Sequence, residues 1–364
     1  MQYRNRFPDF SRLLFLGAWI LFLVVAARSP IATGLARQQN APCVFDNFVW
    51  FKELEIITEI RKDLPSFDGT APESGESVRI IMSALERLLK TKKLASEVGY
   101  NLSIGTEFQP RPEHVFTASA ARLNVCKVVF GSPGAAPEPE LQQTARALIN
   151  KPFSRIGARE QTETAIIPVY RKHGHLRAVP RMPAGELDPA CKNAVVVKIA
   201  VDPGVAYVWE RAVWSGARLI PAQQLDQMLA MRAGEVASGQ KIDAGLGAVI
   251  RSYGKQGYAG MQLQPAPEFN DAGRRITLNI LVNEGPQYRM GALNVAGLSD
   301  ASAAMFKELW RLKPGDVYDA TYLGEFLKRL MDAGGIPADQ VARIKPAVKP
   351  DPQKRTVDVV IQFN

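Results

Sequence analysis

The sequence repeats itself at an interval of 81 residues. The stretch LVNEGPQYRMGALNVAGLSD (281–300) has a counterpart in AVDPGVAYVWERAVWSGARL (200–219). Identical residues recur at this offset: Gly204 and Gly285, Tyr207 and Tyr288, Gly216 and Gly297, Gly234 and Gly315, and Val236 and Val317. Self-similarity at a fixed period of this length predicts a row of similar supersecondary units and argues against one large core. A chain of 364 residues is long enough for several such units.

Two further copies lie upstream. In the nearer copy, RLNVCKVVFG ends at Gly131 and matches the stretch that ends at Gly216. In the same copy, VVVKIAVDPG (195–204) matches TLNILVNEG (277–285). The most N-terminal copy is divergent. In it we expect LPSFDG (64–69) to join two helices and SVRIIMSALERLL (77–89) to be the second of them. The expected modules, numbered first to fourth along the chain, are residues 42–121, 122–204, 205–285 and 286–364.

The last copy predicts the elements of one module. YRMGALNVAG alternates in polarity and is expected to be a strand. Ser299 can cap the following helix, in which Met305, Leu309 and Leu312 stand at helical spacing. KPGD (313–316) ends that helix. YLGEFLKRLMDAG is a second amphipathic helix, and its apolar face comprises Leu323, Phe326, Leu327 and Leu330.

Two strands complete the module, at about 340–348 and 356–363, with KPDPQK (349–354) as the turn. We expect the repeat offset to shrink by two residues here, because TLNILVN then aligns with TVDVVIQ. The order β-α-α-β-β predicts an α+β fold in which two helices cover one face of a three-stranded sheet. Successive modules join directly, so we expect an elongated string. Its hinges would be Pro203, Gly204, Gly285 and Pro286.

The N-terminus is typical of an export signal. Arg4, Arg6 and Arg12 precede LLFLGAWILFLVVAA (13–27). This apolar run is shorter than the ~20 residues that a bilayer span needs. We expect residues 1–36 to be a signal peptide that is cleaved after Ala36. The alternative is an uncleaved anchor in the inner membrane.

Little in the sequence points to a chemical site. His173 and His175 in HGH offer two metal ligands, but no third ligand is nearby in the sequence. AGLGAV (244–249) is an incomplete nucleotide-binding fingerprint. The formal net charge of +9 is spread along the chain without a basic and aromatic cluster. We therefore expect no catalytic site, metal or cofactor, and no nucleic-acid partner.

The whole pattern resembles the polypeptide-transport-associated (POTRA) domain. That family has the β-α-α-β-β order, a V-x-E-G-P-x-Y entry into the first strand, a glycine at the strand-to-helix turn, and K-P-G-D-x-Y between the helices. The matching residues here are Val282, Glu284, Gly285, Pro286, Tyr288, Gly297, Lys313, Pro314, Gly315, Asp316 and Tyr318. The resemblance is closest in the third and fourth modules, extends to the second, and is weakest in the first.

POTRA domains occur mainly in outer-membrane assembly and secretion translocases, in the periplasm before a C-terminal β-barrel. This sequence stops at Asn364 without segments that would build a barrel. The resemblance therefore implies a non-enzymatic periplasmic scaffold that works alone or beside a barrel made by another chain. The expected partners are unfolded outer-membrane polypeptides or a separate β-barrel protein, which would associate the protein with the outer membrane. The alternative is an inner-membrane-anchored organiser of envelope or division complexes.

The edges of the sheets are the expected binding surfaces, because an extended polypeptide can add to an edge as a further strand. In the family the second strand of a module is an outer one and the third is central. YAGMQLQP (258–265) would then be an outer strand, with Met261 and Leu263 facing the helices. In the last module, charged side chains can protect the same edge. The predicted client-binding edge comprises Gln262, Gln264, Arg343 and Lys345.

The cysteines are Cys43, Cys126 and Cys191, and their spacings fit no zinc pattern. In an oxidising compartment, two of them can form a disulfide. In the family the first and third strands of a module pair in parallel. That pairing would bring Cys126, in the first strand of the second module, close to Cys191, which precedes its third strand. The resemblance therefore implies a disulfide between Cys126 and Cys191.

Overall fold

The computed structural model describes residues 40–72, 75–95, 97–119, 123–131, 134–192, 194–333 and 344–363. The expected signal peptide lies outside these residues. In the described part of the chain, the buried hydrophobic side chains form four clusters, and each falls within one predicted module. The module boundaries themselves stay a prediction.

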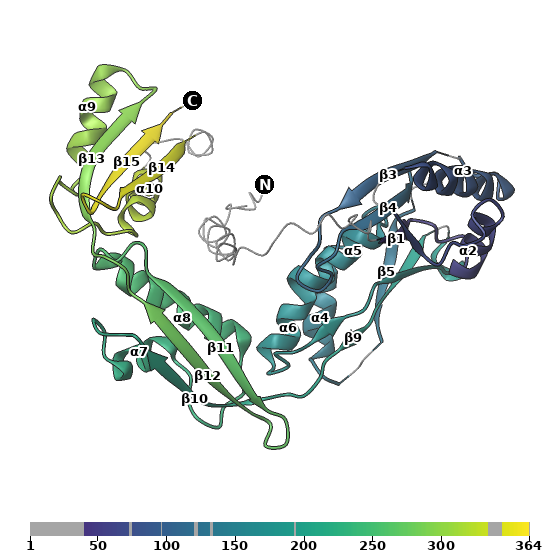
Figure 1. Ribbon diagram of the computed structural model, residues 1–364, viewed down its shortest axis with the longest axis horizontal. Helices are drawn as coiled ribbons and strands as arrows, with labels where there is room; N and C mark the ends of the chain where they lie inside the picture. The colour runs from purple at the N-terminus through teal and green to yellow at the C-terminus, as the bar shows by residue number, and fades with distance from the viewer. Residues whose placement is uncertain are drawn as a thin grey trace, which may run out of the picture. The chain divides into compact units, whose positions relative to one another are not determined.

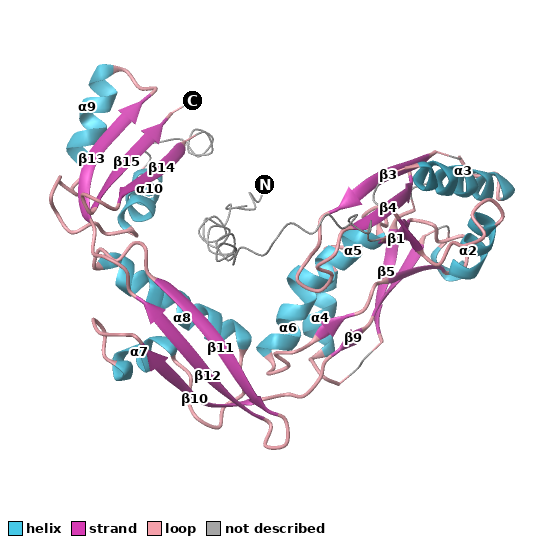
Figure 2. Cartoon of the chain, viewed as in Figure 1, coloured by secondary structure: helices cyan, strands magenta, loops and turns pink. Residues whose placement is uncertain are grey.

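The third module contains the elements that the repeat predicts (Figure 1). They are β10 (Val208–Ser215), α7 (Ala222–Leu229), α8 (Gly239–Lys255), β11 (Gln262–Asn270) and β12 (Arg275–Asn283). The strand order is β10-β12-β11, with β10 parallel and β11 antiparallel to β12. Figure 2 shows these strands side by side with α8 running along them. Leu278 and Ile280 of β12 are buried in this module's core, whereas Leu281 is 48% exposed. The helices therefore cover one face of the sheet.

The fourth module repeats this order. Its elements are β13 (Arg289–Ala296), α9 (Asp300–Leu309), α10 (Tyr322–Asp332), β14 (Lys345–Asp351) and β15 (Thr356–Gln362), and the strand order is β13-β15-β14. The predicted cap is confirmed, because the Ser299 hydroxyl accepts a hydrogen bond from the Ser302 N–H. The predicted apolar positions of α9 are wrong in part. Phe306 enters the core, while Met305 is 61% and Leu309 50% exposed.

The outer strands of both modules extend beyond their predicted ends and contain prolines. β11 continues through Pro265 and Pro267 to Asn270. β14 contains Pro346 and Pro350, so 349–351 belong to the strand and not to the predicted turn. Proline is tolerated in an edge strand when its nitrogen points away from the sheet.

The strand register shows that the repeat keeps its 81-residue offset to the end of the module. Val213 opposes Asn279 in the third module, and Asn294 opposes Val360 in the fourth. Both members of the second pair lie 81 positions after those of the first. The expected shortening of the offset is therefore wrong. A shift of two residues keeps every side chain on the same face of a strand, so the hydrophobic pattern alone could not exclude it.

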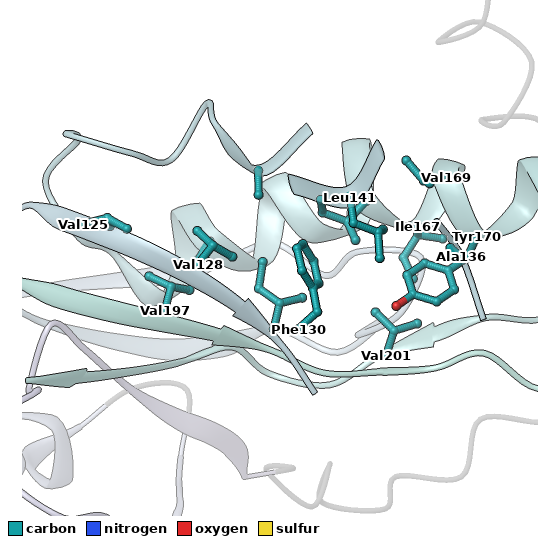
Figure 3. Packing of buried hydrophobic residues seen from close by; sticks show 14 of the residues in the cluster. Val125, Val128, Phe130, Ala136, Leu141, Ile167, Val169, Tyr170, Val197 and Val201 are labelled. Carbon is teal, nitrogen blue, oxygen red and sulfur yellow. The ribbon is translucent and has the colours of Figure 1, made fainter. Parts of the chain in front are cut away.

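The second module has the same sheet order with a more broken helical layer. Its strands β5 (Val125–Phe130), β7 (Ala184–Leu187) and β8 (Val195–Ile199) are ordered β5-β8-β7. The other elements are α4 (Glu138–Ala145), α5 (Arg155–Gln161), a π-helical turn (Thr162–Ile166), α6 (Ile167–Lys172), a 3₁₀ turn (Pro189–Cys191), and the short paired strands β6 (Val179–Pro180) and β9 (Val201–Asp202). Figure 3 shows side chains of this core, including Phe130, Leu141 and Tyr170, between the strands and the helices.

The first module departs from the expected three-stranded sheet. Its strand order is β2-β1-β4-β3. Its elements are β1 (Ala41–Asp46), α2 (Glu53–Arg61), β2 (Thr70–Ala71), α3 (Glu76–Thr91), β3 (Val98–Ser103) and β4 (Glu113–Ala118). The additional strand β2 comes from the segment between the helices and pairs antiparallel with β1. The predicted second helix is confirmed as α3.

The segment between the helices also pairs with the first strand in the other modules. Bridges join Asn124 to Pro152, Val208 to Val236 and Arg289 to Val317. In the third module the Trp209 N–H donates to the Glu235 carbonyl at 2.8 Å, and the Gly234 N–H donates to the Trp209 carbonyl at 2.8 Å. The glycine of the KPGD-type loop lies in the left-handed region, with φ +85° at Gly234 and +91° at Gly315. This loop therefore occupies the outer side of the first strand where that strand begins.

Two glycines of the third module allow the cost of backbone conformation to be separated from that of close packing. Gly216 and Gly234 both have positive φ. A Cβ added at Gly216 would collide with the carbonyl oxygen of Val282, whereas one added at Gly234 would meet nothing within 4 Å. We expect Gly234→Ala to cost about 1 kcal/mol and Gly216→Ala about 3 kcal/mol. Hydrogen exchange of the β10 and β12 amides would measure both, and equal costs would contradict the packing argument.

Candidate functional site

Within the described residues, β11 lies at an edge of its sheet. Gln262 and Gln264 are exposed, Met261 is buried in the core, and Leu263 packs against that core. The alternation agrees with the predicted orientation of this strand. The role of Gln262 and Gln264 in binding a client stays a prediction.

The direction of the main-chain groups along β11 follows from the register. The Val208 N–H donates to the Arg274 carbonyl at 2.9 Å, so Arg274 and every second residue after it direct their main-chain groups toward β10. The intervening residues of β12 bond to β11 and oppose Gln262, Gln264, Ala266, Glu268 and Asn270. Leu263 therefore directs its N–H and C=O away from β12, toward the open side of the sheet.

The predicted edge of the fourth module is on a different sheet. Lys345 begins β14 and is exposed. Lys345 opposes Gln362, and Gln264 opposes Leu281, so Gln264 and Lys345 occupy equivalent places one repeat apart. Arg343 lies outside the described residues. The structure thus puts Gln262, Gln264 and Lys345 on two comparable sheet edges and does not gather them into one site.

After each predicted hinge, a tyrosine N–H forms an equivalent main-chain hydrogen bond to the preceding module. Gly204 and Gly285 have φ of +61° and +65°, a region that favours glycine. The Tyr207 N–H donates to the Gly174 carbonyl at 2.9 Å, and the Tyr288 N–H donates to the Gly257 carbonyl at 2.8 Å. The start of each of these modules is therefore bonded to the turn that follows the last helix of the module before it. Bending at Pro203, Gly204, Gly285 or Pro286 stays a prediction.

A group of side chains beside the first of these junctions was not predicted. Arg177 lies 3.1 Å from Asp271, and the Tyr207 hydroxyl donates to Asp271 at 2.5 Å. The Arg177 guanidinium also lies 5.3 Å from the centre of the Phe269 ring. The hydrogen bond from Tyr207 and the charge of Arg177 lower the pKa of Asp271. These contacts connect the tip of the β11–β12 hairpin to the loop after α6.

Polar contacts also join the first and second modules. Arg159 of α5 forms an ion pair with Glu113 of β4, and the side chains are only 8% and 7% exposed. Asp46, at the end of β1, accepts hydrogen bonds from the N–H groups of Arg155 and, at 3.3 Å, Ile156. A carboxylate at the first turn of a helix supplies acceptors for N–H groups that lack helical partners. No motif in the sequence indicated these pairs.

Glu284, the glutamate of the V-x-E-G-P motif, has a structural role in the third module. Its carboxylate accepts hydrogen bonds from the N–H groups of Arg218 at 2.7 Å and Leu219 at 2.8 Å, and from the Tyr253 hydroxyl at 2.9 Å. Burial alone would raise the pKa of Glu284, but the bonds from Leu219, Arg218 and Tyr253 outweigh it, so its pKa is lowered. The motif residue thus connects the end of β12 with the turn after β10 and with α8.

We expect Glu284→Gln to lower the free energy of unfolding of the third module by about 1–2 kcal/mol at neutral pH, because charge-assisted hydrogen bonds are lost. A carboxyl whose pKa is lowered by folding stabilises the fold above its unfolded pKa, and this stabilisation is lost as the pH falls through the folded pKa. The difference between the two proteins should therefore shrink as the pH falls below the ordinary glutamate pKa of about 4.3. Hydrogen exchange of the α8 amides would measure it, with Glu308→Gln on exposed α9 as the control. A pH-independent difference would contradict the role of the charge.

The predicted disulfide is confirmed. Cys126 and Cys191 are bonded, with their Cα atoms 6.2 Å apart. The parallel pairing of β5 with β8, in which Val125 opposes Val195, brings both cysteines to the same end of the sheet. Cys43 is a free thiol. Burial and the nearby Asp68 raise its pKa to about 12, so it is held as the unreactive protonated form.

The other candidate residues have ordinary partners. His173 lies 2.9 Å from Glu140, and the His175 ring nitrogen lies 3.2 Å from the Gly204 carbonyl oxygen. Among the described residues, no group of three or more His, Cys, Asp and Glu side chains is arranged to hold a metal ion. No helix in the described ranges is both long enough and apolar enough to cross a bilayer.

Comparison with known proteins identifies the fold of the repeat. The family model for POTRA, described as a surface antigen variable number repeat, matches residues 207–285. These residues have the sequence pattern and the strand order of a POTRA domain. The same strand order, junction bonds and loop bridge recur in the fourth module, so the tandem α+β modules share the POTRA fold.

Two relatives extend this comparison. The chain is 21% identical over 222 residues to a protein of Treponema pallidum (strain Nichols) named as an outer membrane protein assembly factor. That match covers 60% of this chain and only 26% of the relative. The crystal structure of POTRA domains 3–5 of BamA from Haemophilus influenzae matches with a TM-score of 0.56 and 17% identity, covering 67% of this chain and 96% of that one. The structural likeness concerns the fold.

Proposed function

We propose that this chain is a non-enzymatic periplasmic scaffold in outer-membrane protein assembly or secretion. The POTRA fold and the name of the Treponema pallidum relative support the process. On this proposal its partners are unfolded outer-membrane polypeptides or a separate β-barrel protein, and it associates with the outer membrane through them.

The observation that carries the proposal is the outer edge of β11. Leu263 directs its N–H and C=O outward from a sheet edge, and its neighbours Gln262 and Gln264 are exposed and uncharged. An extended polypeptide that adds at such an edge is held by main-chain hydrogen bonds, which tolerate many sequences. This tolerance suits clients that arrive unfolded and share little sequence.

A photo-crosslinking experiment tests the proposal. Photo-reactive residues at Gln262 or Gln264 are expected to capture unfolded outer-membrane polypeptides in the cell envelope. The same residue at Gln227, which is exposed on α7, is the control and should capture few. Equal capture at all positions, or capture only at Gln227, would show that β11 is not the binding edge.

A further inference from the structure

Two prolines lie on the outward positions of β11. Pro265 opposes Ile280 and Pro267 opposes Leu278, and the register of β11 is continuous from Gln262 to Asn270. Both therefore share the outward main-chain direction of Leu263. A proline nitrogen has no hydrogen to donate, and its ring occupies the space beside it. From Gln262 to Pro267, the open side of β11 thus offers the donor and acceptor of Leu263, followed by two carbonyl groups without donors.

The same device recurs in the fourth module. In β14, Pro346 opposes Ile361 and Pro350 opposes Val357, which gives them the same outward direction. Pro346 lies 81 residues after Pro265, at the equivalent place in its strand. In the second module, Pro183 directly precedes β7. The outer strand of the first module, β3, has the sequence VGYNLS and contains no proline.

We propose that Pro265 and Pro267 confine strand addition on β11 to the few residues around Leu263. The inference rests on the proposed function and identifies the residues that limit it. The occupant is an extended polypeptide segment of neutral, alternating character, because the exposed residues beside Leu263 carry no charge.

The limit follows from hydrogen-bond geometry. An added strand can form a complete pair of main-chain bonds with Leu263. Its next inward-directed residue can donate to the Pro265 carbonyl, but the carbonyl of that residue meets the proline ring and stays unbonded. An unbonded carbonyl displaced from water is unfavourable, and the next inward-directed residue faces the same deficit at Pro267. Pairing therefore stops near Gln264, so each contact is short and readily released.

The experiment restores the missing donors in the full chain. The variant carries Pro265→Thr and Pro267→Thr, and Glu268→Thr is the matched control on the same strand. The probe is a synthetic peptide of about ten residues that alternates apolar and serine residues, the length of a barrel strand. Photo-reactive residues at Gln262 and at Ala266 report how far along β11 the peptide pairs, and sedimentation reports self-association through the edge.

In the wild-type protein and in the Glu268→Thr control, the peptide should crosslink at Gln262 and not at Ala266. The double-threonine variant should crosslink at both positions and bind the peptide about tenfold more tightly, because two donors are regained. One contradicting outcome is that the wild type crosslinks the peptide at Gln262, but the variant gains no crosslink at Ala266, no affinity for the peptide and no self-association. The inference about the prolines would then be wrong, and the proposed function would stand. A second outcome is that the variant pairs with the peptide or with itself while the wild type captures nothing. The prolines would then block the edge completely, and both the limited pairing at Leu263 and the proposed binding of clients on β11 would be wrong. Equal wild-type capture at Gln262 and Ala266 would overturn the limit.

Discussion

Replacing both Cys126 and Cys191 with alanine is expected to lower the free energy of unfolding of the second module by about 4 kcal/mol. The disulfide closes a loop with a sequence separation of 65 residues. In the chain-entropy model, a loop of this size restricts the unfolded chain by about that amount. A module with a small core of its own has a small free energy of unfolding, so a loss of this size is a large part of it. We therefore expect the variant to be partly unfolded at about 37 °C.

Hydrogen exchange of the β5 and β8 amides would measure the loss in the second module alone. Cys43→Ala is the matched control, because Cys43 is a free thiol in the first module. Adding a reductant to the wild-type protein should reproduce the double substitution. Unchanged protection of β5 and β8 in the double variant would contradict the stabilising role of the bond.

Glu113→Gln is expected to destabilise the contact between the first and second modules by about 3–5 kcal/mol. The substitution leaves the Arg159 guanidinium buried without its countercharge, and breaking a buried ion pair from one side costs about this much. Among the described residues, the carboxylate that stays paired with Arg159 is the more distant one of Glu163, at 4.0 Å. Protection of the α5 and β4 amides against exchange would report the loss.

Two further variants separate the ion pair from other effects. Glu186→Gln breaks the pair of Glu186 with Lys198, whose side chains are 56% and 54% exposed, and should cost less than about 1 kcal/mol. Replacing both buried partners, with Glu113→Leu and Arg159→Met, should recover most of the loss, because neither charge then stays buried alone. If Glu113→Gln and Glu186→Gln cost the same, burial of the first pair is not decisive.

The sequence predicted the elements well where a local pattern specifies them. The order of strands and helices in the third and fourth modules, the Ser299 cap and the disulfide followed from periodicity, capping chemistry and the family's pairing of strands. The ends of the outer strands were wrong, because the strand of the third module was predicted to end at Pro265 and Pro350 was assigned to a turn. Whether a proline ends a strand depends on which way its nitrogen points in the ladder, and that direction becomes known only with the register.

The contacts between modules could not be predicted for a different reason. Glu113 and Arg159 are 46 residues apart, and Arg177 and Asp271 are 94 apart. Each side chain alone is an ordinary charged residue, and only the packing of one module against the next gives it a partner. Periodicity describes how a module is built and contains no information about which loops meet at its ends.

The pairing of first with last strands has a consequence for how the chain would fold if it is exported, as the proposed function requires. In the third module β10 pairs with β12, so residue 208 meets its partner only when residue 275 has become available. A polypeptide that crosses a membrane from its N-terminus must therefore deliver a whole module before that sheet can close. The Tyr207 and Tyr288 amides then bond to a turn of the module delivered just before. Each completed unit thus provides a docking point for the next, and folding is expected to advance vectorially in steps of one module.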